Sequence, residues 1–126
     1  MGLRTRELRV CFRHFPVRSS HPRAFAAACA AEAAGAQGAF WPMHDALFAD
    51  QGRLEDPHLW AHAQRLGLGL ERFEADRRAQ ATAGHVNRDF RAGVRAGVVS
   101  TPTLFIAGEQ WAGRPTAALW ARLDDR

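Results

Sequence analysis

The alternation of hydrophobic and polar residues predicts a β-strand near the start of the chain. Over residues 7–15 apolar side chains occupy every second position, at Leu8, Val10 and Phe12. A period of two residues is typical of a strand with one buried face. Pro16 is expected to end this strand, because proline cannot donate to a sheet ladder.

After this strand the spacing of apolar residues changes to the three- and four-residue intervals of amphipathic helices. The first helix is predicted from its many alanines, which are the best helix formers. A two-strand hairpin follows the helices. The predicted helices cover residues 23–34, 39–49, 56–66 and 70–96, with an interruption of the last near Gly84.

Polar and glycine residues predict where these helices begin and end. Ser19 or Ser20 is expected to cap the first helix, and Asp56, which precedes a proline, the third. Gly35 and Gly67 are expected to stop the same two helices, since glycine readily adopts the conformation that ends a helix.

The predicted hairpin pairs residues 104–106 with residues 110–112 around the Ala107-Gly108 turn. Pro102 enters the first of these strands, where a proline is tolerated, and its bond to Thr101 is a candidate for a cis peptide. An ordinary loop proline is the alternative. A last helix is expected from Pro115. The order of elements predicts the α/β class with an all-helical insertion.

The composition limits the classes of protein to which the chain can belong. The 126 residues are 47% hydrophobic and 24% charged, which fits a single globular domain. All 17 basic residues are arginines scattered along the chain, so we expect no nucleic-acid partner. No apolar stretch is long enough to span a membrane, and the charged start does not resemble a signal peptide. We therefore expect no membrane partner and a cytoplasmic location for the chain as given.

The two cysteines, Cys11 and Cys29, form neither a C-x-x-C motif nor a zinc pattern. We predict that each is a small buried hydrophobe, with a disulfide or a reactive thiol as the alternative.

Four histidines are interpreted from their sequence positions. His58 and His62 stand four residues apart, a spacing that can bind metal, but no third ligand accompanies them and we expect two solvated side chains. We expect His44 and Asp45 to diverge around a helix and serve in surface or packing roles. His14 is predicted to be structural. No metal site is expected.

Three motifs together carry a resemblance to a known family. They are F-R-H-F-P at residues 12–16, F-W-x-M-H-D-x-L-F at residues 40–48, and T-P-T at residues 101–103. In this order they resemble the DsbA family of thioredoxin-fold thiol-disulfide oxidoreductases. The resemblance implies a thioredoxin-like fold with a helical insertion at residues 19–96 of a single domain at 1–126. It also implies a cis-proline loop of Ser100, Thr101 and Pro102 that binds an extended peptide.

The chain departs from that family in lacking the C-x-x-C, which in the family precedes the F-R-H-F-P strand. We therefore expect an incomplete thioredoxin-like fold, with its first strand and active-site helix absent, and no catalytic residue among the 126. The chain is expected to be redox-inactive as given. It is interpreted as a truncated form of a longer protein, in which case an export signal could be missing too, or as a degenerate member.

The family implies an extended peptide or a protein thiol or disulfide as substrate, and no cofactor. The alternative function is a non-catalytic module that binds peptides or proteins in the cis-proline groove. The gap left by the missing strand also exposes a sheet edge, through which the chain could form a homodimer.

Overall fold

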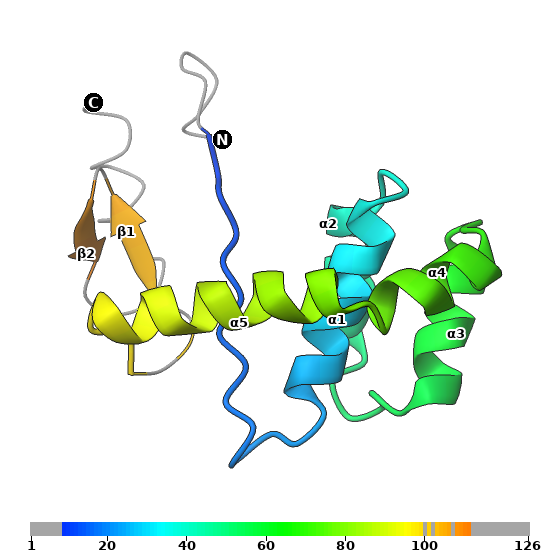
Figure 1. The fold of residues 1–126 in the computed structure, drawn as a ribbon, viewed down its shortest axis with the longest axis horizontal. Coiled ribbons are helices and arrows are strands. Elements are labelled where there is room, and N and C mark those ends of the chain that lie inside the picture. The colour runs from blue at the N-terminus through cyan, green and yellow to red at the C-terminus, as the bar shows by residue number, and fades with distance from the viewer. Residues whose placement is uncertain (1–8, 100, 102, 107, 112–126) are drawn as a thin grey trace. The chain divides into compact units, whose positions relative to one another are not determined.

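The structure, a computed structural model, describes residues 9–99, 101, 103–106 and 108–111. Residues Arg13–Gly93 form one compact unit, called here the helical unit, and the other described residues belong to a second unit that holds a hairpin. The elements are α1 (Ala24–Gly35), α2 (Phe40–Ala49), α3 (Asp56–Arg65), α4 (Leu70–Arg77), α5 (Gln80–Arg95), β1 (Leu104–Ile106) and β2 (Glu109–Trp111) (Figure 1).

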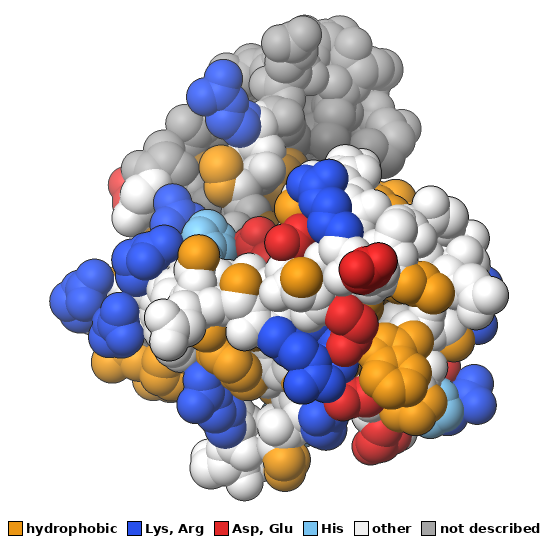
Figure 2. All heavy atoms as spheres, turned by 45° about the vertical axis from the view of Figure 1, so that its right-hand side comes forward, with side chains coloured by type: hydrophobic (Ala, Val, Ile, Leu, Met, Phe, Trp, Pro, Cys, Tyr) orange, Lys and Arg blue, Asp and Glu red, His pale blue; other side chains and the backbone are white. Residues whose placement is uncertain are grey.

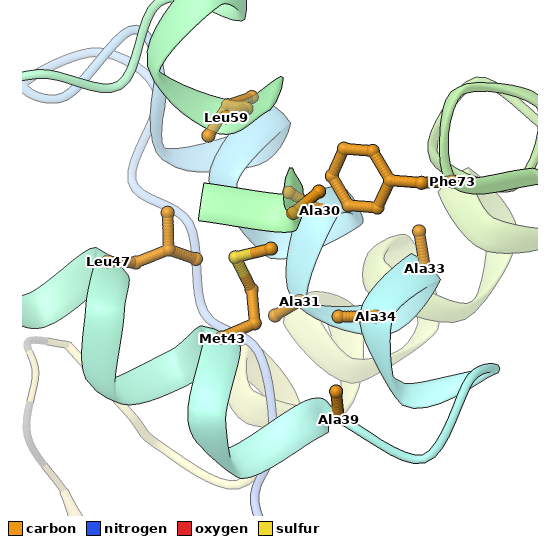
Figure 3. Packing of buried hydrophobic residues seen from close by; sticks show 10 residues of the cluster. Ala30, Ala31, Ala33, Ala34, Ala39, Met43, Leu47, Leu59 and Phe73 are labelled. Atoms are coloured by element: carbon orange, nitrogen blue, oxygen red, sulfur yellow. The ribbon is translucent and has the colours of Figure 1, made fainter. Parts of the chain in front are cut away.

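The core of the helical unit is built on the alanine-rich face of α1. Because alanine side chains are small, larger side chains from three other helices reach this face. In Figure 3, Met43 and Leu47 of α2, Leu59 of α3 and Phe73 of α4 point toward it. Met43, Leu59 and Phe73 are fully buried. The buried face of α1 consists of Cys29, Ala30, Ala31, Ala33 and Ala34.

Glycines end the first and third helices, as predicted. Gly35 is the last residue of α1, and the left-handed conformation is adopted three residues later by Gly38, with φ of 79°. Gly35 also lies against α2, where an added Cβ would come within 3.3 Å of Phe40 Cβ. Gly67, with φ of 74°, follows the end of α3 as predicted.

The predicted helix caps, by contrast, were wrong. Arg23 precedes α1 and Glu55 precedes α3, and neither start has a side-chain capping hydrogen bond from the described residues. Ser19 and Ser20 lie in the turn before α1. Asp56 is the first residue within α3, and its carboxylate binds the guanidinium of Arg23 at 2.6 Å. Asp56 thus forms an ion pair with Arg23 in place of the predicted capping hydrogen bond.

The long helical region predicted for residues 70–96 breaks after Arg77, not near Gly84, which lies within α5. The break has a physical reason. Phe73 and Val86 are both fully buried, yet thirteen residues at about 100° each would place them about 140° apart around one straight helix. Two shorter helices allow both side chains to face the core.

The strand predicted for residues 7–15 is not formed at the described positions 9–15. A strand needs a partner, and β1 and β2 pair only with each other among the described residues. The side chain of Val10 is 69% exposed. Further along, Phe15 stacks on Phe90 of α5 at 4.6 Å, so the coil segment from Arg13 to Pro16 is held to the helical unit by side chains.

The hairpin prediction is confirmed. β1 and β2 are antiparallel, with Leu104 opposite Trp111 and Ile106 opposite Glu109, one residue earlier than the sequence predicted for the second strand. The helix predicted from Pro115 lies outside the described residues. Within the described part of the chain, no helix has the length and apolarity needed to cross a bilayer.

Candidate functional site

The predicted peptide-binding loop falls mostly outside the described residues, which include Thr101 but neither Ser100 nor Pro102. Thr101 is exposed and lies in a bend shortly before β1. The cis-proline and the groove beside it therefore stay predictions.

The two cysteines lie in different environments, and both are free thiols. Cys29 is 4% exposed in the middle of α1, as predicted. Burial raises the pKa of its thiol, while the positive charge of Arg18 opposes the rise. Cys11 is exposed, so its predicted burial was wrong, because the strand that would have buried it does not form.

His62 is buried, which corrects the prediction of two solvated histidines on this helix. Its Nδ1 lies 2.6 Å from the guanidinium of Arg65, while its buried Nε2 has no hydrogen-bond partner among the described residues. Burial, and then the charge of Arg65, lower the pKa of His62. The sequence held a signal for this burial, since His62 stands three residues after Leu59 on the apolar stripe. His58 is partly exposed, near Glu55.

His44 and Asp45 do meet, contrary to the prediction. Nδ1 of His44 lies 3.1 Å from Oδ1 of Asp45 on the surface of α2. The backbone directions diverge, but the two side chains are long enough to turn toward each other. The ring of His44 also packs 5.0 Å from Trp41 and 4.6 Å from Phe48. Asp45 is 78% exposed, so the pair forms no enclosed site.

Among the described residues, one group of side chains that could hold a metal ion brings together three segments of the helical unit. His14 comes from the coil segment, Glu32 from α1 and His85 from α5. Nε2 of His14 lies 2.8 Å from Oε1 of Glu32, and Nε2 of His85 lies 2.9 Å from the same oxygen. The three ligand atoms all lie within 4.8 Å of one another. We call these residues the His14–Glu32–His85 cluster.

Asp89 of α5 contacts two members of this cluster. Its Oδ2 accepts a hydrogen bond from the backbone N–H of His14 at 3.1 Å and lies 3.6 Å from Nε2 of His85. Its Oδ1 lies 3.8 Å from the exposed guanidinium of Arg13. Because Asp89 is only 7% exposed, these neighbouring groups, rather than solvent, stabilise its carboxylate.

Comparison with known families identifies the chain. The model of the DSBA-like thioredoxin domain matches residues 6–122. The chain belongs to this family. The predicted resemblance and the thioredoxin-like α/β class are therefore confirmed, and the family is one of thiol-disulfide oxidoreductase-like domains. No solved structure is significantly similar to the chain.

The curated relatives that match the chain are much longer proteins. The chain is 45% identical over 109 residues to a protein of Salinispora arenicola named Na(+)/H(+) antiporter NhaA 1, a match that covers 84% of this chain and 16% of that protein. It is 43% identical over 107 residues to the Na(+)/H(+) antiporter NhaA of Herminiimonas arsenicoxydans, covering 85% and 17%. The chain thus spans about a sixth of the length of these relatives.

His14 was predicted to be structural, and its contacts with Glu32, His85 and Asp89 were not predicted. Two signals were available. Glu32 is the single charged residue of α1, and His85 and Asp89 stand four residues apart, on one face of a predicted helix. Neither signal could place these residues beside His14, because only the packing of α5 and the coil segment brings them together.

Proposed function

We propose that this chain carries the helical and hairpin parts of a DsbA-like thiol–disulfide exchange domain and is itself redox-inactive as given. The observation that carries the proposal is the state of its thiols. A family member needs two cysteines in a C-x-x-C, and this chain has one exposed thiol in a coil and one buried in α1.

The chemistry of Cys29 argues against a nucleophilic role. The thiolate is the reactive form, and a raised pKa reduces its population near neutral pH. Catalytic cysteines gain thiolate character at a helix N-terminus, an effect that fades beyond the first turn. Cys29 lies in the interior of a 12-residue helix, where this stabilisation is absent.

Insulin reduction tests the proposal. With dithiothreitol as electron donor, the chain is expected to precipitate insulin no faster than buffer, while a thioredoxin-fold enzyme with a C-x-x-C serves as positive control. The Cys11→Ser/Cys29→Ser double variant should match the parent. Catalysis that disappears in this variant would overturn the proposal.

Two origins account for the missing cysteine pair, and the genomic DNA upstream of the codon for Met1 separates them. A strand pattern followed by C-x-x-C in the same frame supports a truncated form of an active enzyme. A stop codon immediately upstream supports a degenerate member that has lost its chemistry.

The second candidate function is a non-catalytic module that binds an extended peptide beside Ser100, Thr101 and Pro102. Its support is the exposed Thr101 close to β1, where backbone groups can pair with an added strand. The test is fluorescence anisotropy of a labelled, carboxymethylated unfolded polypeptide. Thr101→Arg should weaken binding of the polypeptide. Gln51→Arg, which places an arginine at another exposed position, should not. Equal affinities for the parent and both variants would reject this site.

A homodimer through the hairpin is a further proposal about partners. Among the described residues, β1 and β2 pair only with each other, so each has an edge that can pair with another chain. Analytical ultracentrifugation should then give a mass that rises with concentration, and Phe105→Lys, at a 43% exposed position of β1, should lower it. A concentration-independent monomer mass would reject the dimer.

The names of the relatives do not extend this proposal to ion antiport. The similarity covers about a sixth of those proteins, and that shared segment is the DSBA-like domain. The proposal therefore concerns thiol chemistry and peptide binding, not transport.

A further inference from the structure

We propose that the His14–Glu32–His85 cluster is a binding site for a divalent transition-metal ion, with Zn²⁺ as the ion that fits its ligands best. The site lies within the helical unit and involves neither cysteine. It would tie the coil segment to α1 and α5.

The ligand types favour zinc over the harder cations. Two imidazole nitrogens and one carboxylate oxygen are a set that Zn²⁺ accepts, whereas Ca²⁺ and Mg²⁺ require mostly oxygen ligands. Three protein ligands leave a fourth position for water or another molecule. The three donor atoms are Nε2 of His14, Oε1 of Glu32 and Nε2 of His85.

The distances need only a small adjustment to hold the ion. Ligand atoms about 2.1 Å from a tetrahedral zinc ion lie about 3.4 Å from each other. Both nitrogens lie slightly closer than this to Oε1 of Glu32, at 2.8 and 2.9 Å, and all three atoms lie within 4.8 Å of one another. His85 is 48% exposed, so its ring has room to move.

His14 is held in place by burial and by its neighbours. His14 is 3% exposed, its ring lies edge-on to that of Phe40 at 6.1 Å, and Asp89 holds its backbone N–H. Asp89 Oδ2 also lies 3.6 Å from Nε2 of His85. Asp89 is therefore a positioning residue, whose carboxylate adds negative charge beside the ion without being one of the three ligands.

The same contacts would exist without a metal if each Nε2–H donated a hydrogen bond to Glu32. A measurement of Zn²⁺ binding therefore distinguishes a metal site from a cluster held by hydrogen bonds alone. The full chain should bind one equivalent of Zn²⁺ in competition with a chromophoric chelator, with thiols kept reduced. Cys11→Ser should leave the affinity unchanged.

Variants assign the binding to the cluster. His85→Ala, at an exposed position that should not affect folding, and Glu32→Gln should each weaken Zn²⁺ binding by at least about tenfold, since even the outer partners of a metal site are worth about 10–100-fold. His58→Ala is the matched control, because His58 and His62 on α3 are the competing pair of histidines. Circular dichroism checks that each variant is folded.

Co²⁺ gives an independent readout, because tetrahedral coordination produces intense visible absorption that His85→Ala should abolish. The proposal is overturned if the chain binds no Zn²⁺, if His85→Ala binds as tightly as the parent, or if His58→Ala loses as much affinity as His85→Ala.

Discussion

The carboxylate of Asp56 lies 2.6 Å from the guanidinium of Arg23, which joins the start of α3 to the start of α1. The other oxygen of Asp56 lies 3.3 Å from Arg77 of α4, whose side chain is 7% exposed. Arg77 is also bound by Glu74. Figure 2 shows acidic side chains set among arginines on the face that it draws. Asp56 therefore links three helices through charge.

Removing the charge of Asp56 should destabilise the helical unit. Asp56→Asn weakens the bonds to Arg23 and Arg77 and leaves the buried guanidinium of Arg77 with less compensation. Because Asp56 is 34% exposed, we expect a loss at the low end for charged hydrogen bonds, about 1–2 kcal/mol in the free energy of unfolding. Urea denaturation measures this loss. Asp45→Asn, on an exposed site, should change it by less than about 0.5 kcal/mol.

The same charged network makes the free energy of unfolding depend on pH in the acidic range. The hydrogen bond from Arg23 lowers the pKa of Asp56 below 3.8. For Glu74 burial acts in the opposite direction, but hydrogen bonds from Arg77, Trp60 and Arg78 outweigh it and lower the pKa below 4.5. The stabilisation is thus complete above these ordinary values and is lost as the pH falls through the lower folded ones.

Urea unfolding at a series of acidic pH values measures this dependence. The free energy of unfolding should fall below about pH 4.5, and less steeply in an Asp56→Asn/Glu74→Gln double variant. An identical pH dependence in parent and double variant would show that other carboxylates dominate acid unfolding.

His62 predicts a separate dependence at milder pH. Its pKa is lowered below 6.5, chiefly by burial, so protonation is harder in the folded state. Its contribution to stability is complete above about pH 6.5 and is lost as the pH falls toward the folded pKa. The melting temperature should drop between about pH 7 and pH 5, and the drop should be smaller in His62→Leu. His58→Leu, on the same helix but partly exposed, should keep the drop of the parent.

Leu59 tests the alanine-based core. It is fully buried against the face of α1, and its truncation to alanine leaves a cavity. We expect Leu59→Ala to lower the free energy of unfolding by about 2–5 kcal/mol. Leu70→Ala, at a 42% exposed position, should cost much less. Similar losses for the two variants would mean that Leu59 does not belong to the core in solution.

The helices were largely predictable because their signals are local. The apolar stripes of α2 and α3 and the glycine after α3 are visible in the sequence. The break between α4 and α5 was not, since it depends on Phe73 and Val86 both reaching the core. The alternation at residues 7–15 predicted a strand, but alternation cannot supply the partner that a strand needs.

The candidate site was less predictable than the fold. Its residues are drawn together by packing between segments distant in sequence, as with His14 and Glu32, eighteen residues apart. The thiols show the same limit, because the exposure of Cys11 depends on whether its segment becomes a strand.

The redox state of the two thiols shows whether the chain as given is redox-inactive. The native chain is equilibrated in glutathione buffers of increasing oxidising strength and quenched with acid. Its mass is then measured by mass spectrometry. We expect glutathione addition at Cys11 alone, no loss of two hydrogens, and modification of Cys29 only after unfolding in urea. A native disulfide between Cys11 and Cys29 that forms and breaks with the buffer potential would show that the chain is redox-active.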